Sequence, residues 1–161
     1  MTIAYIGIGG NLAQPIDTVK SAIEALKTLS HSEWLGVSSL YRSKPMGPAD
    51  QPDYINAVAA VDTQLEALEL LDNLQQIEQQ HGRVRKDERW GPRSLDLDLL
   101  LYGEQHINHP RLVVPHYGMR EREFVLHPLY ELQSDIIFTD GISLQQLVAQ
   151  VPANGIEKIT I

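Results

Sequence analysis

Up to Gly103 the hydrophobic residues change their period several times, and the order of these changes limits the folds open to the chain. β-branched, aromatic or alternating runs predict strands at residues 2–9, 34–42, 54–63 and 95–102. Apolar residues at helical spacing predict helices at residues 15–29 and 65–80, with Gly82 placed to end the second helix. The resulting order, β-α-β-β-α-β, is the split arrangement of the ferredoxin-like fold.

Glycine and proline separate these elements. They predict loops at residues 43–52 and 83–93, and the strand at 54–63 can pair with the strand at 34–42 across the first loop. Beyond Gly103 we expect a helix at residues 120–132, interrupted at Pro128, and another at residues 144–151. The expected fold is therefore α+β, a single domain over residues 1–161 with an antiparallel sheet and a helical C-terminal extension.

Composition excludes several classes of function. With 13 Lys and Arg against 21 Asp and Glu, the net charge is -8, which disfavours binding to nucleic acid or an anionic membrane surface. The chain has no cysteine, so disulfides, thiolate metal sites and cysteine nucleophiles are excluded. It has no apolar run of ~18 residues and no signal-peptide pattern at its start. We expect a cytoplasmic globular protein.

The charge is distributed unevenly. Residues 83–122 carry 8 basic and 6 acidic side chains, a net of +2, whereas the segments on either side carry nets of -6 and -4. A cationic middle in an acidic chain indicates a site for a small anionic ligand.

The strongest chemical pattern is Asp96-Leu97-Asp98 within a leucine-rich strand. Residues two apart in a strand share a face, so the two carboxylates lie roughly 7 Å apart on one side. We expect Leu95, Leu97, Leu99 and Leu101 to fill the other side. Carboxylates this close repel unless a cation joins them, and Mg²⁺ prefers such oxygen ligands. Taken alone, the pattern is also typical of a solvated strand face.

The predicted loop at residues 83–93 carries five cations and leads directly into that strand. Arginine side chains match phosphate oxygens, and a carboxylate-bound metal beside them is what phosphoryl transfer requires. A solvated loop balanced by Asp87 and Glu88 is the alternative interpretation, but the neighbouring carboxylates favour a phosphate site.

Weaker candidates lie elsewhere. Gln75 and Glu78 share a helix face, although such residues are usually solvated. His116 lies in a segment bracketed by Arg111, Arg120 and Arg122, and could meet phosphates with them. Two aromatic residues, Tyr54 and Phe124, could hold a flat heterocycle between their rings. The run Gly7-Ile8-Gly9-Gly10 lacks the remainder of any phosphate-loop motif and is discounted.

Together these segments resemble the 6-hydroxymethyl-7,8-dihydropterin pyrophosphokinase family of folate biosynthesis. The resemblance is carried by residues 89–100, which read RWGPRSLDLDLL, and by matching blocks at residues 4–9, 41–43, 47–48, 50–54, 82–85 and 114–117. It implies a ferredoxin-like α+β fold and a monomeric enzyme without nucleic-acid or membrane partners. It further implies transfer of diphosphate from ATP to the hydroxymethyl group of the pterin, with two Mg²⁺ ions and release of AMP.

The resemblance also implies roles for individual residues. Asp96 and Asp98 would bind both metal ions, Arg83 and Arg93 would clamp the phosphates, and Arg85 would close over ATP. The remaining nucleotide contacts would be Gln75, Glu78, Leu99 (through its backbone), Arg111, His116, Tyr117 and Arg122. The pterin would stack between Tyr54 and Phe124, with Asn56, Ser43 and the backbone of Met46 at its polar edge and Trp90 closing the lid.

Three positions depart from the family pattern. Gly10 stands where serine is common, Ser43 stands for threonine, and Val113 stands where a hydroxyl residue can meet the nucleotide. Val113 is therefore left out of the expected site.

Two other functions stay open from the residues alone. A ferredoxin-like sheet beside a basic loop could bind RNA, but the net charge and the leucine-aspartate strand count against this. A metal-dependent phosphohydrolase could use the same two carboxylates, and it would release ADP and phosphate from ATP alone.

Overall fold

The computed structural model describes residues 1–10, 15–43, 54–81, 95–151 and 156–159. The strands are β1 (Thr2–Gly10), β2 (Ser32–Val37), β3 (Leu40–Ser43), β4 (Tyr54–Thr63), β5 (Asp96–Tyr102), β6 (Ile107–His109), β7 (Leu112–Val114) and β8 (Glu157–Ile159). The helices are α1 (Pro15–Lys27), α2 (Ala67–Gln80), α3 (Glu123–Leu132) and α4 (Leu144–Gln150), with a 3₁₀ turn at Met119–Glu121. None of the helices in these ranges has the length and hydropathy that crossing a membrane requires.

The main sheet has the strand order β5-β1-β4-β3-β8, with β2 paired to β4 beside β3. Every pairing in it is antiparallel. The predicted pairing between the second and third strands is confirmed, because β4 pairs with both β2 and β3. With α1 and α2 as connections, this is the α+β ferredoxin-like arrangement that the sequence predicts.

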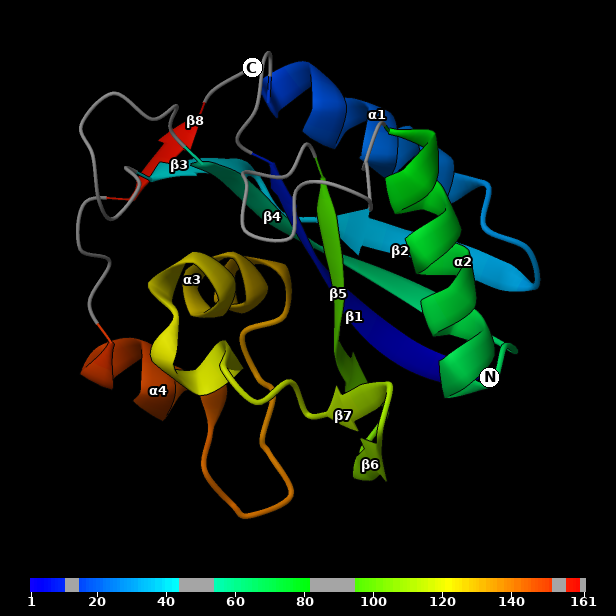
Figure 1. Ribbon diagram of the computed structural model, residues 1–161. Helices are drawn as coiled ribbons and strands as arrows, with labels where there is room; N and C mark the ends of the chain where they lie inside the picture. Colours follow the sequence, from blue (N-terminus) through cyan, green and yellow to red (C-terminus); the bar gives the residue numbers. More distant parts are fainter. Residues whose placement is uncertain (11–14, 44–53, 82–94, 152–155, 160–161) are drawn as a thin grey trace.

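Helices cover both faces of the sheet (Figure 1). On one face, α1 and α2 bury a cluster that includes Ile6, Leu26 and Leu74. On the other face, α3 and α4 bury a second cluster that includes Leu126 and Leu144. The C-terminal extension is therefore helical, as expected, and supplies the second layer that an exposed sheet face would otherwise lack.

The single strand predicted at residues 34–42 is wrong, because β2 and β3 are separated at two serines. The backbone N–H of Ser38 donates to the Val58 carbonyl, and Val58 N–H donates back to the Ser38 hydroxyl at 3.0 Å. The backbone N–H of Ser39 instead donates a hydrogen bond to Oε2 of Glu131 at 2.9 Å. Serine side chains that bond to the backbone in this way interrupt a regular ladder.

The predicted position of Leu101 is also wrong. The pairing of β1 with β5 shifts register between Tyr5, which opposes Leu101, and Ile6, which opposes Leu99. This β-bulge at Leu100 places Leu101 in the α3–α4 cluster with Leu100, while Leu95, Leu97 and Leu99 lie in the other cluster as expected.

The C-terminal elements differ from the prediction in two respects. The break in the segment 120–132 lies at Arg122, whose backbone is extended, and Pro128 is inside α3. Pro128 falls in the second turn of this helix, where it removes one intrahelical bond without ending the helix. The helix at residues 144–151 is confirmed as α4, but β8 and the β6–β7 hairpin were missed by sequence reasoning.

Candidate active site

The two carboxylates of β5 lie on the face of the sheet that α3 covers. Leu97 and Leu99 are buried on the opposite face, Asp98 is exposed, and Asp96 is partly exposed. Two glycines of the neighbouring strand stand directly opposite, Gly9 facing Asp96 and Gly7 facing Asp98. Because directly opposed residues share a face and glycine has no side chain, β1 places no side chain of its own beside either carboxylate. The Leu100 side chain lies 3.4 Å from the Cβ position of Gly7, and Asn56 Oδ1 lies 2.9 Å from that of Gly9.

This arrangement fits a hard divalent cation. Asp96 and Asp98 offer oxygen ligands at a partly solvated place, as Mg²⁺ requires, and Mg²⁺ usually keeps several waters or phosphate oxygens besides one or two carboxylates. Within the described residues, no group of three or more His, Asp or Glu side chains is arranged to hold a metal ion by itself. The donor set is therefore suited to a metal that arrives with a phosphate ligand.

Glu78 is buried, which differs from the solvated helix residue that its position alone would predict. Its side chain on α2 is only 4% exposed, and its Oε2 accepts a hydrogen bond from Leu97 N–H at 2.8 Å. Among the described strands β5 is an edge of the main sheet, so within that part of the chain this N–H has no other strand to pair with. Glu78 thus fixes β5 between the two candidate metal ligands.

His116 lies within electrostatic range of both Asp98 and Arg122. Burial lowers the pKa of His116, the Asp98 carboxylate raises it, and the Arg122 guanidinium lowers it again, so that the pKa lies below its ordinary value. Nδ1 accepts the backbone N–H of Gly118 at 3.2 Å. The neutral ring therefore carries its proton on Nε2, where it can donate to a phosphate oxygen.

Arg122 lies among aromatic rings. Its Cζ is 5.9 Å from the ring centre of Tyr117 and 5.8 Å from that of Phe124, and the Tyr117 ring stacks on His116. A Cβ on Gly118 would lie 2.9 Å from Cζ and Nε of Arg122, so the guanidinium occupies space that only glycine leaves. The Tyr117 side chain is 80% exposed. The Leu99 side chain is only 2% exposed, so Leu99 could contact a nucleotide only through its backbone.

Three residues expected at the pterin, Ser43, Tyr54 and Asn56, lie on the same face of the sheet as the two carboxylates. Asn56 of β4 lies directly opposite Gly9 of β1 on one side and Tyr41 of β3 on the other. Ser43 of β3 lies opposite Tyr54 of β4. Asn56 is buried, with its Oδ1 2.9 Å from the point where a Cβ of Gly9 would lie, and Tyr54 is exposed. Phe124 lies in the first turn of α3, the helix that covers this face.

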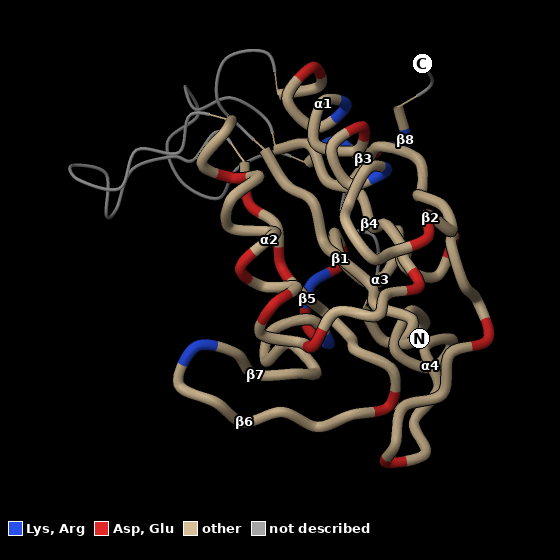
Figure 2. The backbone as a smooth tube through the Cα atoms, turned by 90° about the vertical axis from the view of Figure 1, so that its right-hand side faces the viewer, with Lys and Arg blue, Asp and Glu red and all other residues tan. Residues whose placement is uncertain are grey.

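Arg111 makes its contacts with α2 rather than with the carboxylates of β5. From the turn between β6 and β7, its Nη2 donates to Asp72 Oδ1 at 2.5 Å and to Gln75 Oε1 at 3.2 Å. Acidic positions recur along α2 (Figure 2), and Asp72 belongs to them. The structure thus joins two predicted nucleotide contacts, Gln75 and Arg111, directly, and adds Asp72, which the sequence did not single out, as a second partner of Arg111.

Five of the expected site residues, Met46, Arg83, Arg85, Trp90 and Arg93, lie outside the described residues.

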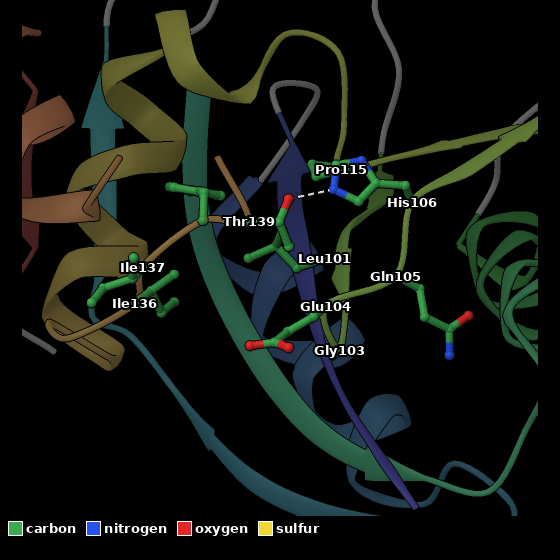
Figure 3. A pocket seen from close by; sticks show the side chains of 10 residues that line it. Leu101, Gly103, Glu104, Gln105, His106, Pro115, Ile136, Ile137 and Thr139 are labelled. Atoms are coloured by element: carbon green, nitrogen blue, oxygen red, sulfur yellow. Dashed lines mark hydrogen bonds between the residues drawn. The ribbon is translucent and has the colours of Figure 1, made fainter. Parts of the chain in front are cut away.

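A separate hollow lies at the other end of β5 (Figure 3). There the ring of His106 is hydrogen-bonded to the Thr139 hydroxyl, and the walls include Leu101, Pro115 and Phe138. None of the expected site residues lines it. The hollow is therefore distinct from the candidate active site.

Sequence reasoning also missed the surroundings of Asn56. Gly9 was discounted as an incomplete phosphate motif, and Tyr41 served only as part of the resemblance. The signal for Gly9 was available, because a glycine inside a predicted strand indicates close approach of another group. The contact of Tyr41 with Glu131 spans 90 positions and left no local pattern.

The solved structures most informative here are two forms of HPPK-DHPS from Plasmodium falciparum. The wild type gives a TM-score of 0.76 over 99% of this chain, and the wild type with pteroate gives 0.74 over 92%. Both are 12% identical to this chain, so they support the shared fold alone. The chain spans less than half of these solved chains, 44% and 42% of their lengths.

Curated relatives are far more similar in sequence. A 2-amino-4-hydroxy-6-hydroxymethyldihydropteridine pyrophosphokinase of Pseudomonas aeruginosa is 52% identical, covering 96% of this chain and 95% of the relative. One of the same name from Haemophilus influenzae is 49% identical, covering 93% of both chains. The family model for 7,8-dihydro-6-hydroxymethylpterin-pyrophosphokinase (HPPK) matches residues 5–134. The chain therefore belongs to the 7,8-dihydro-6-hydroxymethylpterin-pyrophosphokinase family.

Proposed function

We propose that this protein transfers diphosphate from ATP to the hydroxymethyl group of 6-hydroxymethyl-7,8-dihydropterin and releases AMP, a step of folate biosynthesis. The observation that carries the proposal is the near-complete alignment with the two bacterial pyrophosphokinases, whose shared name states this activity. The geometry of Asp96, Asp98 and their neighbours supports it.

The proposed reaction needs no nucleophile from the protein. The substrate hydroxyl attacks the β-phosphorus of ATP, the bond from that phosphorus to the α-bridging oxygen breaks, and AMP leaves. The hydroxyl proton goes to a base or to solvent. What the protein contributes is alignment of the alcohol with the β-phosphorus and stabilisation of the phosphate charge. The absence of cysteine is compatible with this chemistry.

Asp96 and Asp98 would hold two Mg²⁺ ions together with the phosphates of ATP. When bound, the metal supplies positive charge against the phosphate oxygens. His116 would donate from Nε2 to a phosphate oxygen, and Arg122 would bind a neighbouring one with its guanidinium. Arg83 and Arg93 would clamp the transferred group, with Arg85 over ATP.

The pterin would lie on the face of the sheet that carries Asn56. A side-chain amide both donates and accepts hydrogen bonds, which suits the alternating donors and acceptors of a pterin edge. The rings of Tyr54 and Phe124 would stack on the two faces of the heterocycle. Ser43, Met46 and Trp90 would complete this subsite, and Gln75, Glu78, Leu99, Arg111 and Tyr117 would complete the nucleotide subsite.

We further propose a monomer that acts in the cytoplasm on small molecules, without nucleic-acid or membrane partners. The net charge of -8 supports the absence of a polyanionic partner. Sedimentation velocity would test the oligomeric state, and a dimer at assay concentrations would contradict it.

The decisive experiment is to incubate the protein with ATP, Mg²⁺ and hydroxymethyldihydropterin and to identify the nucleotide released. We expect AMP in equal amount to the pyrophosphorylated pterin. Release of ADP, or ATP hydrolysis that does not require the pterin, would refute the proposal and favour a phosphohydrolase.

A further inference from the structure

One row of directly opposed residues crosses the main sheet from β8 to β5. Lys158 opposes Tyr41, Tyr41 opposes Asn56, Asn56 opposes Gly9, and Gly9 opposes Asp96. Directly opposed residues of antiparallel strands point to the same face, so the row lies beneath α3. It includes Asn56 and Asp96 of the candidate site, whereas Tyr41 and Lys158 have no expected contact with either substrate.

A single carboxylate on α3 holds the β3–β8 end of this row. Glu131 accepts a hydrogen bond from the Tyr41 hydroxyl through Oε1, and from both the N–H and the hydroxyl of Ser39 through Oε2, each at 2.9 Å. Lys158 Nζ lies 3.8 Å from Oε1. The last turn of α3 is thereby joined to β3 and to β8.

The ionisation states strengthen this contact. Burial raises the pKa of Glu131, but hydrogen bonds from Tyr41 and Ser39, together with Lys158, outweigh that effect and hold the pKa below its ordinary value. Burial and the hydrogen bond to Glu131 raise the pKa of Tyr41 well above its ordinary value. Near neutral pH a phenol therefore donates to a carboxylate, a charge-assisted bond stronger than one between neutral groups.

Asn56 is confined on both sides along the row. On one side its Oδ1 lies 2.9 Å from the point where a Cβ of Gly9 would be, so the amide extends over a position without a side chain. On the other side it faces Tyr41, which is 8% exposed. Cross-strand neighbours of this kind have Cβ atoms about 5 Å apart, so the Tyr41 ring limits where the amide can turn.

We propose that Glu131 is a positioning residue for the pterin subsite. It fixes the Tyr41 ring, and the ring keeps the Asn56 amide directed over Gly9 toward the polar edge of the substrate. This inference rests on the proposed function, and it assigns to β8 a share in the subsite through Lys158.

The test is the separate effect of Glu131→Gln and Tyr41→Phe on the two substrates. Each variant should raise KM for hydroxymethyldihydropterin about fivefold to tenfold and leave KM for ATP within about twofold. The double variant should be no worse than the poorer single one, because both act through the same contact. Glu24→Gln, which removes an exposed carboxylate paired with Lys27 at 2.9 Å, is the matched control and should change neither KM.

The outcomes separate the inference from the proposed function. Wild-type protein that releases no AMP contradicts the proposed function itself. Wild-type turnover with unchanged pterin KM in both variants, or with both KM values raised alike, overturns the positioning role. If both variants fail to fold, Ser39→Ala serves as the test, because it removes only one hydroxyl hydrogen bond to Glu131. This variant should raise KM for the pterin about twofold and leave KM for ATP unchanged. An unchanged pterin KM in that variant overturns the inference as well.

Discussion

Asn56 and Asp96 oppose the same residue, Gly9, from the two strands that flank β1. The amide expected at the pterin and a carboxylate expected at the metal are thus separated by one position without a side chain. In the proposed reaction the hydroxymethyl group must reach from the pterin to the phosphates. At Gly9 no side chain of β1 stands between the two groups, and the Asn56 amide itself extends over this position.

Gly9→Ala should weaken pterin binding. The added Cβ would lie 2.9 Å from Asn56 Oδ1, so the amide must move. We expect KM for the pterin to rise about tenfold in steady-state kinetics, with KM for ATP little changed. Gly36→Ala is the matched control in the same sheet, since its Cβ would meet Leu132 at 3.6 Å, an ordinary contact. Equal kinetics in the two variants would contradict the role of Gly9.

Asp98→Ala should abolish most turnover and leave the fold intact. The side chain is exposed and belongs to neither hydrophobic cluster, so its removal costs little stability. Loss of a proposed metal ligand should lower kcat by at least about 100-fold. AMP release and thermal unfolding would be measured together. Asp140→Ala, which removes a carboxylate 2.8 Å from Arg120 outside the candidate site, should keep its activity, and near-normal turnover of Asp98→Ala would refute the metal assignment.

Gly118→Ala should act on the nucleotide. Its Cβ would lie 2.9 Å from Arg122, and the guanidinium would have to leave its place between Tyr117 and Phe124. The expected result is a KM for ATP raised about tenfold or more, consistent with the loss of one charged hydrogen bond. Isothermal titration with a non-hydrolysable ATP analogue would measure the change directly, and an unaltered affinity would show that Arg122 does not bind the nucleotide.

Glu78→Ala should destabilise the protein. It leaves the N–H of Leu97 buried without its carboxylate partner, at a cost of about 1–3 kcal/mol in the free energy of unfolding. Urea denaturation would measure this loss. Gln75→Ala on the same helix is partly exposed and should cost less than about 0.5 kcal/mol. Similar stabilities for the two variants would contradict the structural role of Glu78.

The stability that Glu131 contributes should depend on pH. A carboxyl group whose pKa is lowered on folding stabilises the protein above its ordinary pKa of about 4.3, and this contribution is lost as the pH falls through the lower folded value. Urea denaturation of wild type and Glu131→Gln should therefore give a difference that is largest near neutral pH and shrinks below about pH 4. A difference independent of pH would show that the ionised carboxylate is not what stabilises the fold.

Local periodicity was sufficient to predict the β-α-β-β-α-β core. The period of apolar residues identified β1, β4, β5, α1 and α2 because each buries one face against its neighbours. It failed at Ser38, whose hydroxyl accepts a backbone N–H of β4, and at Ser39, whose N–H donates to the Glu131 carboxylate. It also failed at Leu100, where a bulge reverses the alternation. Such features depend on the partner strand or helix and have no signature within a short window.

The candidate site was predictable to the extent that its residues form short motifs. Asp96 and Asp98 could be identified because two carboxylates are spaced two apart in a leucine-rich strand. Asp72, Gly9 and Glu131 were not predicted, because their importance comes from what they meet in space: Arg111, Asn56 and Tyr41. Contacts between distant segments are set by packing, which a single sequence does not display.

The pairing of β3 with β8 has a consequence for how the protein is made. β3 emerges early from the ribosome and β8 much later, since most of the chain lies between them. In the finished fold β3 lies between β4 and β8, so before β8 is made none of the described strands can cover that second edge of β3. We expect a nascent chain arrested before residue 157 to be more easily cleaved by protease near β3 than the released protein, and equal protection would contradict this. β3, which carries Ser43 of the proposed pterin subsite, is thus among the last strands of the sheet to gain both of its neighbours.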